Sequence, residues 1–498
     1  MTDKRMKKAA PKKQTSGPAR QSDYGFFVLI ALLIFFWIAF VAMGTFQPLS
    51  QTITGVDPVG YYAWVHSVLF DFDLDFHNEY QALNPEGAIS GDILVDPNGP
   101  RTATGHLPNA FSIGPGLLWA PFLILGHAYA YARGYHTDGF SQPYFAAVAY
   151  ANMIYAWLGV LLLYYALRTW FRPAVSLVAT IAAWACSPAL YYTYGQEAVS
   201  HDCSLFSVAL LLFLWARLRR RDEWWVWAII GASVGLAILV RWQNITFAAL
   251  VAVDLLWRDQ IKNIPKMIAS GIASVLVFLP QMIGWKILYG SMFTIPQGGA
   301  FMDWAHPNLI KLFFSPEYGL ITWTPLCALG MAGLFFIPKD RRRIFVAILV
   351  AFLIQLYVGA VAGNVGWSFG MRRMINCIPL FAVGYALLMT RFAINLKMAV
   401  AVVALFAFWN FLFALQYGGI LDPYYVQTAL SKLAGQQGIS VEQLAKSDRL
   451  PDGTPFDLQQ FAQTHRFPRD TAPSFSQFVP DKLRVIRAIF TRLLLIGT

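Results

Sequence analysis

The stretch ITGVDPVGYYAWVHSVLFDFDLDFHNEY, residues 53–80, directly follows the first strongly hydrophobic segment of the chain. Asp57 lies there in a Gly-Val-Asp-Pro turn, close behind the expected outer end of a membrane helix. The aromatic-rich amphipathic run after it, which includes Tyr61, Tyr62 and Trp64, is typical of a helix that lies at a membrane surface. The stretch therefore predicts a carboxylate held at the membrane surface, where a lipid-borne substrate can reach it.

The composition predicts a multi-spanning membrane protein. Of 498 residues, 57% are hydrophobic and only 13% are charged, and the mean hydropathy is +0.49. A soluble chain of this length could not bury so much apolar surface. The net charge of +11 comes from Lys and Arg residues that cluster between hydrophobic segments, as the positive-inside rule describes. We therefore expect membrane lipids as partners, and no nucleic acid.

Charge and hydropathy divide the chain into three parts. Residues 1–25 form a basic arm, expected to be disordered and cytoplasmic, and residues 26–415 form the transmembrane domain. Within that domain, residues 47–143 are the first external loop, whose first part is strongly acidic and is expected to form juxtamembrane helices. Residues 416–498 form a small periplasmic helical tail, whose last, basic amphipathic helix is expected to lie on the membrane.

The fold class that follows is all-α, a polytopic helical membrane protein with about 11 transmembrane helices. The predicted spans are residues 26–46, 144–167, 174–194, 203–215, 225–240, 247–257, 267–288, 318–337, 344–362, 374–390 and 398–415. Residues 112–133 have two interpretations. In the preferred one they are re-entrant or juxtamembrane, with Gly114-Pro115-Gly116 and Pro121 breaking the helix. In the other they cross the membrane, which would place Arg168 and Arg172 on the outer side.

This topology places the unusual polar residues of the chain at one face, the outer one: Asp57, His201, Asp202, Arg241, Arg372 and Arg373. Charged residues at the outer ends of spans run against the positive-inside tendency, which favours a functional interpretation. Each also has a structural alternative. Asp57 can cap a helix that starts near Pro58, His201 can be a hydrogen-bonded interface residue, and the arginines can extend to lipid headgroups.

Acids elsewhere in the external region have simpler explanations. Glu317 is expected to be an acid in the first turn of a helix, where the helix dipole favours it. The alternating acids of Phe-Asp-Phe-Asp-Leu-Asp, residues 70–75, and Glu79 are interpreted mainly as a solvated loop. The alternative is that they hold a divalent cation, the one cofactor that the sequence leaves open. No metal ligands are assigned.

The polar residues of the outer face suit sugar transfer from a lipid phosphate. Asp57 offers a carboxylate that can take the proton of an acceptor hydroxyl. Guanidinium groups stabilise the charge that develops on a phosphate leaving group, and Arg241, Arg372 and Arg373 are the candidates. Tyr61, Tyr62 and Trp367 can stack on a sugar or line the lipid tail, and His201 with Asp202 can shape the sugar site. The sequence has no Walker loop, dinucleotide fingerprint or nucleophile elbow.

These landmarks and their order resemble the GT-C membrane glycosyltransferases, which include protein O-mannosyltransferases and lipid A aminoarabinose transferases. The shared features are an Asp followed by Tyr in the first external loop, a Gly/Pro-interrupted apolar segment near residues 114–121, the His201-Asp202 turn, and Arg241 in a short outer turn. The motifs GVDPVGYYAWVHS, SPEYGLITWTP and GWSFGMRR look like a bacterial branch, and the resemblance covers roughly residues 26–390. The first-loop motif here is Asp-Pro in place of an Asp-Glu pair, which leaves a second carboxylate or metal role open.

The resemblance implies a polyprenyl-phosphate-linked sugar donor that is used on the outer face of the membrane. We therefore expect a multi-pass enzyme of a bacterial inner membrane, with a cytoplasmic N-terminus and a periplasmic active site, that transfers the sugar to a lipid, glycan or protein acceptor. Two alternatives remain at this point: a transporter or flippase of lipid-linked glycans, and a non-catalytic assembly subunit. A transporter needs ionisable groups along a path to the inner face, where Asp254 is the chief candidate.

Overall fold

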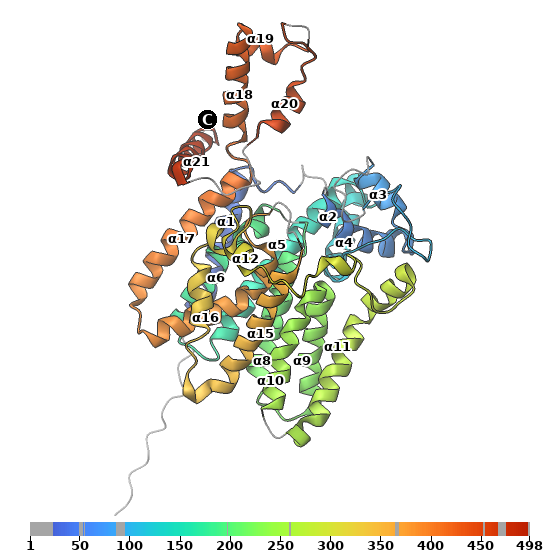
Figure 1. The fold of residues 1–498 in the computed structure, drawn as a ribbon, viewed down its shortest axis with the longest axis vertical. Coiled ribbons are helices and arrows are strands. Elements are labelled where there is room, and N and C mark those ends of the chain that lie inside the picture. The colour runs from blue at the N-terminus through green and yellow to red at the C-terminus, as the bar shows by residue number, and fades with distance from the viewer. Residues whose placement is uncertain are drawn as a thin grey trace, which may run out of the picture.

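The computed structural model describes residues 23–48, 53, 55–85, 95–196, 198–257, 260–363, 368–451, 454–466 and 475–496. These residues form a helical bundle (Figure 1), and within them the only β structure is two isolated bridges. The all-α prediction is therefore confirmed. The predicted disordered arm falls almost entirely on residues outside the described ranges.

Seven of the described helical segments are long and apolar enough to cross a membrane. They are α1 (Tyr24–Ala42), α5 (Gln142–Leu167), α8 (His201–Leu218), α11 (Gln260–Tyr289), α15 (Arg342–Val361) with the turn η4 (Lys339–Arg341), α16 (Ile378–Arg391) with the turn η5 (Arg372–Cys377), and α17 (Leu396–Tyr417). Shorter apolar helices are α6 (Pro173–Ala185), α9 (Trp224–Val240) and α10 (Ala248–Leu256), the last preceded by the turn η2 (Trp242–Phe247). The protein is therefore multi-pass.

Two of the predicted spans are interrupted. Residues 174–194 divide at Pro188 into α6 and α7 (Ala189–Tyr194), and residues 318–337 divide at Pro325 into α13 (Leu320–Trp323) and α14 (Cys327–Gly333). A proline has no N–H and disfavours helix in the residue before it, so an apolar run that contains one is easily split. The structure therefore leaves the number eleven unconfirmed.

The segment predicted to be the first external loop begins with α2 (Val56–His66), the π-helical turn η1 (Ser67–Asp71) and α3 (His77–Leu83), followed by α4 (Gly114–Arg133). The prediction that glycine and proline break the 112–133 segment is wrong, because α4 is one continuous helix. Pro115 lies in its first turn, where the missing N–H costs nothing, and Pro121 is accommodated inside it. α4 packs along α5 and is not among the span-like helices.

The bundle has two chemically different ends. We call the end that carries α2 and α3 the α2 end; the end of α11 reaches it, where Leu288 accepts a hydrogen bond from Thr104. At the opposite end lie Asp23, Arg168, Arg217, Arg219 and Arg343. The basic clusters that were predicted to share one face thus meet at one end of the molecule.

Asp254 lies in the basic end, inside a buried ion cluster. Its carboxylate is 2.5 Å from Arg219 Nη2 and 2.9 Å from Arg343 Nε, and it accepts a hydrogen bond from Trp215. The two arginines come from the end of α8 and from α15, so groups of neighbouring helices compensate the buried charge of Asp254. Asp254 therefore has a structural explanation that needs no transport path.

The C-terminal tail contains α18 (Asp422–Gln437), α19 (Val441–Ala445), α20 (Leu458–Thr464) and α21 (Phe475–Ile496). In Figure 1 α18, α19 and α20 project beyond the bundle on the same side as α2, and α21 lies beside the end of α17. Lys482 of α21 donates a hydrogen bond to Gln416 of α17, and Arg492 donates one to the Met43 carbonyl. The tail is therefore anchored to the bundle by α21.

Candidate functional site

Asp57 lies in the first turn of α2, and its side chain points to a distant part of the chain. Gly55, with φ +89°, is the residue before the helix, and no side chain caps it. The Asp57 carboxylate instead forms an ion pair with Arg372, with 3.2 Å between Oδ2 and Nη1. The side chains of Asp57 and Arg372 are 24% and 18% exposed, so substrate can reach a pair that is largely shielded from water.

Arg241 and Arg373 lie beside this pair. Arg241 stands at the junction of α9 and η2, and it is within electrostatic range of both Asp57 and Arg372. Arg373, next to Arg372 in η5, is within range of all three. It donates to the Gly363 carbonyl at 2.6 Å and lies over the Phe301 ring at 5.3 Å. Three guanidinium groups and one carboxylate give this region a net positive charge.

His201, the first residue of α8, joins the same cluster. Its Nδ1 is 2.7 Å from Arg241 Nη1. An arginine carries only donors, so Nδ1 must accept and the imidazole must be neutral. The ring packs against Tyr192 at 4.7 Å between centroids. Asp202, one residue later, is rotated around the helix and buried, and it accepts a hydrogen bond from Thr193.

Only one of the two predicted tyrosines lies in this cluster. Tyr61 shares a helix face with Asp57 because the two are four residues apart. Its hydroxyl accepts a hydrogen bond from Ser200 at 2.8 Å, and burial raises the pKa of that hydroxyl. Tyr62 faces elsewhere: its hydroxyl donates to the Gly139 carbonyl at 2.5 Å and its ring packs on Phe145. Trp367 lies outside the described residues.

Tyr192 of α7 was not predicted as a site residue. Its hydroxyl is buried and lies near the backbone N–H of Phe369 without forming a hydrogen bond of normal geometry among the described residues, and it is within electrostatic range of Arg372 and Asp57. In the sequence, the run Tyr-Tyr-Thr-Tyr just before the His201 turn could have indicated this residue. The run lay inside a predicted membrane span, so it was not assigned to the site. We refer to Asp57, Tyr61, Tyr192, His201, Arg241, Arg372 and Arg373 together as the Asp57 site.

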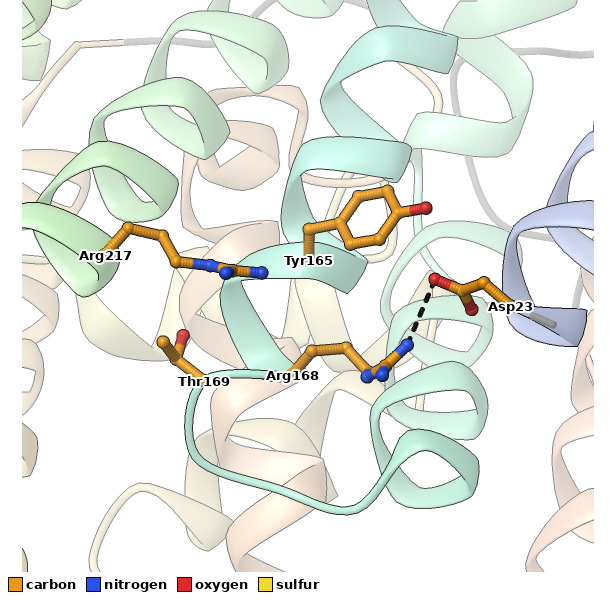
Figure 2. A pocket seen from close by; sticks show the side chains of 5 residues that line it. All are labelled: Asp23, Tyr165, Arg168, Thr169 and Arg217. Atoms are coloured by element: carbon orange, nitrogen blue, oxygen red, sulfur yellow. Dashed lines mark hydrogen bonds and ion pairs between the residues drawn. The ribbon is translucent and has the colours of Figure 1, made fainter. Parts of the chain in front are cut away.

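Two cavities lie at the opposite end of the bundle. The first, of about 310 Å³, is lined by Asp23, Tyr165, Arg168, Thr169 and Arg217 (Figure 2), and Arg168 is paired there with Asp23 at 3.1 Å. The second, of about 670 Å³, is lined by residues 335–341 and aromatic neighbours such as Trp170. None of the residues that line these cavities belongs to the Asp57 site.

Comparison with known proteins adds family and fold information. Residues 140–285 match a family model described as dolichyl-phosphate-mannose-protein mannosyltransferase. A crystal structure of ArnT from Cupriavidus metallidurans in the apo state superposes with a TM-score of 0.50 at 10% sequence identity, covering 93% of this chain and 76% of that one. The chain has the GT-C fold. The family match and the fold together support a GT-C membrane glycosyltransferase.

Another solved structure superposes less well. The Archaeoglobus fulgidus oligosaccharyltransferase superposes with a TM-score of 0.47 at 14% identity, covering 89% of this GT-C chain and 58% of that protein. No curated protein matches the sequence.

Proposed function

We propose that this protein is an inverting glycosyltransferase that uses a polyprenyl-phosphate-linked sugar on the periplasmic face of a bacterial inner membrane. The observation that carries the proposal is the convergence of Asp57, Arg372, Arg241 and His201 at the α2 end. These residues come from four separate elements and are up to 315 positions apart in the chain. A helical membrane protein has no structural need to gather three guanidinium groups around one carboxylate, which supports a functional origin.

The charge of the Asp57 site fits an anionic donor headgroup. Guanidinium groups bind phosphate oxygens through charge-assisted, often two-pronged hydrogen bonds. Arg241 and Arg372 would bind the phosphate of the donor, and Arg373 would add positive charge beside it. The isoprenoid tail of the donor would remain in the lipid, because the site lies at an end of the bundle where a headgroup is expected. His201 and Tyr61 would line the sugar side.

The reaction would be a single displacement at the anomeric carbon. The Asp57 carboxylate takes the proton of the acceptor hydroxyl while that oxygen forms a bond to the anomeric carbon. The bond between the anomeric carbon and the phosphate oxygen breaks, and polyprenyl phosphate leaves with the electron pair. The arginines stabilise the negative charge that grows on this leaving group. The acceptor is a hydroxyl-bearing lipid, glycan or protein.

Replacing Asp57 by Asn tests this role. The amide has nearly the same shape but cannot accept the proton, so we expect transfer from a polyprenyl-phosphate sugar in proteoliposomes to fall by about 100-fold or more. Asp75→Asn is the matched control, since Asp75 is 50% exposed in the same loop. Equal transfer by the well-inserted Asp57→Asn variant and the control would remove Asp57 from the mechanism.

A further inference from the structure

A second cluster of ligand-type side chains lies in the external loop, apart from the Asp57 site. His66 ends α2, Asp71 ends η1 and Glu79 lies on α3, and the loop before α5 approaches them through Asp138. His66 lies nine positions after Asp57 in α2, which is about 14 Å along a helix. The proposed transfer chemistry uses none of these residues.

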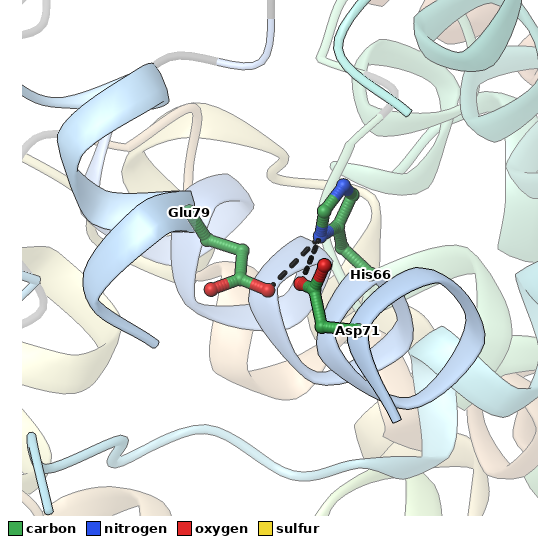
Figure 3. Close-up of side chains that lie close together, drawn as sticks. All are labelled: His66, Asp71 and Glu79. Carbon is green, nitrogen blue, oxygen red and sulfur yellow. Dashed lines mark hydrogen bonds and ion pairs between the residues drawn. The ribbon is translucent and has the colours of Figure 1, made fainter. Parts of the chain in front are cut away.

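The carboxylates of Asp71 and Glu79 converge on the Nδ1 atom of His66 (Figure 3). Nδ1 is 2.9 Å from Glu79 Oε1 and 3.2 Å from Asp71 Oδ2, and one ligand atom from each residue lies within 4.8 Å of the others. Two ligand atoms that each lie about 2.1 Å from a small divalent ion are about 3.0 Å apart when the angle between them is 90°, and about 3.4 Å apart when it is tetrahedral. The separations around Nδ1 match this spacing.

The other nitrogen of His66 decides what Nδ1 can do. Nε2 is 2.8 Å from the carbonyl oxygen of Asp138, which can only accept, so Nε2 carries a proton. In a neutral imidazole, Nδ1 then has a lone pair that faces two carboxylates. Three electron-rich groups this close together repel one another unless a positive charge lies between them. A histidine that donates its second N–H to a backbone carbonyl is the usual arrangement of a metal ligand.

Glu79 supplies an independent indication. Its side chain is fully buried, and Oε2 has no hydrogen-bond partner among the described residues. A buried carboxylate charge is costly, and a cation bound by Oε1, the oxygen that faces His66 in Figure 3, would compensate that charge. A proton shared with His66 would compensate only one of the two carboxylate charges, whereas a divalent ion would compensate both.

Neighbouring groups hold the ligands in place. The rings of Phe70 and Phe140 stack on His66 with centroid distances of 4.8 and 4.2 Å. Asn78 donates to Asp71 Oδ2 at 2.9 Å. Asp71 is 27% exposed, so an ion and its water ligands can enter from this side.

We propose that His66, Asp71 and Glu79 bind a first-row divalent cation of the Zn²⁺ type, which joins α2, η1 and α3 in the external loop. The mixed nitrogen and oxygen donors favour such an ion over Mg²⁺ or Ca²⁺, which prefer oxygen alone. The ion would act as a structural clamp. It is independent of the sugar donor, so the proposal stands or falls separately from the proposed function.

The test uses the purified full-length protein, stripped with a chelator, reloaded with Zn²⁺ and freed of excess ion. We expect about one Zn²⁺ per chain by elemental analysis, with imidazole nitrogen in its X-ray absorption spectrum. His66→Ala and the more conservative Asp71→Asn should lose the ion at least tenfold more readily. His77→Ala and Asp75→Asn, exposed neighbours in the same loop, should retain it.

The absorption spectrum of the wild-type protein keeps the test decisive even if His66→Ala fails to fold. No stoichiometric Zn²⁺ on the wild-type protein would overturn the proposal and leave a protonated His66 as the explanation of the cluster. Wild-type Zn²⁺ content in a well-folded Asp71→Asn variant, or a spectrum without imidazole nitrogen, would also overturn it.

Discussion

At the scale of single residues, the Asp57 site depends on which face of a helix a side chain occupies. Asp57 and Tyr61 are four positions apart and share the face that meets Arg372 and Arg241. Tyr62, one position on, is hydrogen-bonded to Gly139 instead. The sequence alone could nominate the tyrosine pair, but the rotation of α2 about its axis, which selects one of them, is set by packing against Phe111 and Trp119.

Arg372 is the residue whose geometry should matter most. Arg372→Lys keeps the positive charge but loses the fork that can bind two phosphate oxygens, so we expect kcat/KM for the lipid-phosphate donor to fall about 10- to 100-fold. Steady-state transfer in proteoliposomes measures this. Arg101→Lys, at an exposed arginine of the segment between α3 and α4, should change little. Similar kinetics for both lysine variants would show that Arg372 acts only through its charge.

Tyr192 tests function apart from stability, because its buried hydroxyl forms no hydrogen bond of normal geometry among the described residues. Tyr192→Phe should leave the free energy of unfolding unchanged or raise it by up to about 1 kcal/mol, while transfer falls because a substrate contact is lost. Activity and thermal unfolding in detergent measure the two effects.

Tyr194→Phe is the matched control for this prediction. The Tyr194 hydroxyl donates to the Leu33 carbonyl at 2.8 Å and accepts from Trp157, so its removal should lower stability by about 1–3 kcal/mol. Wild-type transfer by Tyr192→Phe would place that hydroxyl outside the reaction.

At the scale of helices, hydropathy predicted the long spans well and the interrupted ones poorly. The α1, α5, α8, α11 and α17 segments are continuous apolar runs, so length alone identified them. The 318–337 run contains Pro325 and divides into α13 and α14, whereas the 112–133 run contains Pro121 and stays one helix. Whether a proline breaks a helix depends on neighbours that satisfy the freed carbonyl, which a window of sequence does not contain.

The buried cluster of Asp254, Arg219 and Arg343 is predicted to hold α8, α10 and α15 together. Asp254→Ala removes the buried carboxylate that pairs with Arg219 and with Arg343, which are 4% and 28% exposed, so we expect the free energy of unfolding to fall by about 3–5 kcal/mol. Asp340→Asn, which removes an acid with a 70% exposed side chain at the same end, should cost about 0–1 kcal/mol. Thermal unfolding of the two variants in detergent provides the comparison, and equal unfolding temperatures would contradict the structural role.

The contact between α21 and α17 should depend on pH through Lys482. Burial lowers the pKa of the Lys482 ammonium to about 7 from its ordinary 10.5, even though it lies over Phe413 at 3.9 Å and next to Asp481. Between these two pH values an undocked α21 binds more protons than a docked one, so docking strengthens as pH rises through the window and is weakest below pH 7.

Hydrogen exchange of α21, corrected for the intrinsic pH dependence of exchange, measures this effect. We expect protection to increase from pH 7 to pH 9 in the wild-type protein and in Lys432→Met, which changes an exposed lysine of α18. Lys482→Met should show no such increase. An equal increase in the Lys482→Met variant would assign the pH dependence to another group.

At the scale of the whole molecule, charge distribution was the most informative sequence feature. Lys and Arg clusters predicted which segments share an end, and the structure brings Arg168, Arg217 and Arg219 to one end and the Asp57 site to the other. Asp57 is 184 positions from Arg241 and 315 positions from Arg372 in the sequence. Only the predicted topology indicated that these residues lie at the same end of the molecule. Individual contacts depend on packing and could not be predicted. Examples are the contact of His201 with Arg241 and the position of Tyr192 in the Asp57 site.

The location of the donor phosphate tests the central claim most directly. In a cryo-electron microscopy map of the protein with a polyprenyl-phosphate sugar, we expect the phosphate to contact Arg241 and Arg372, with the sugar between it and Asp57. Phosphate density at the opposite end, beside Arg168 and Arg217, would contradict the account.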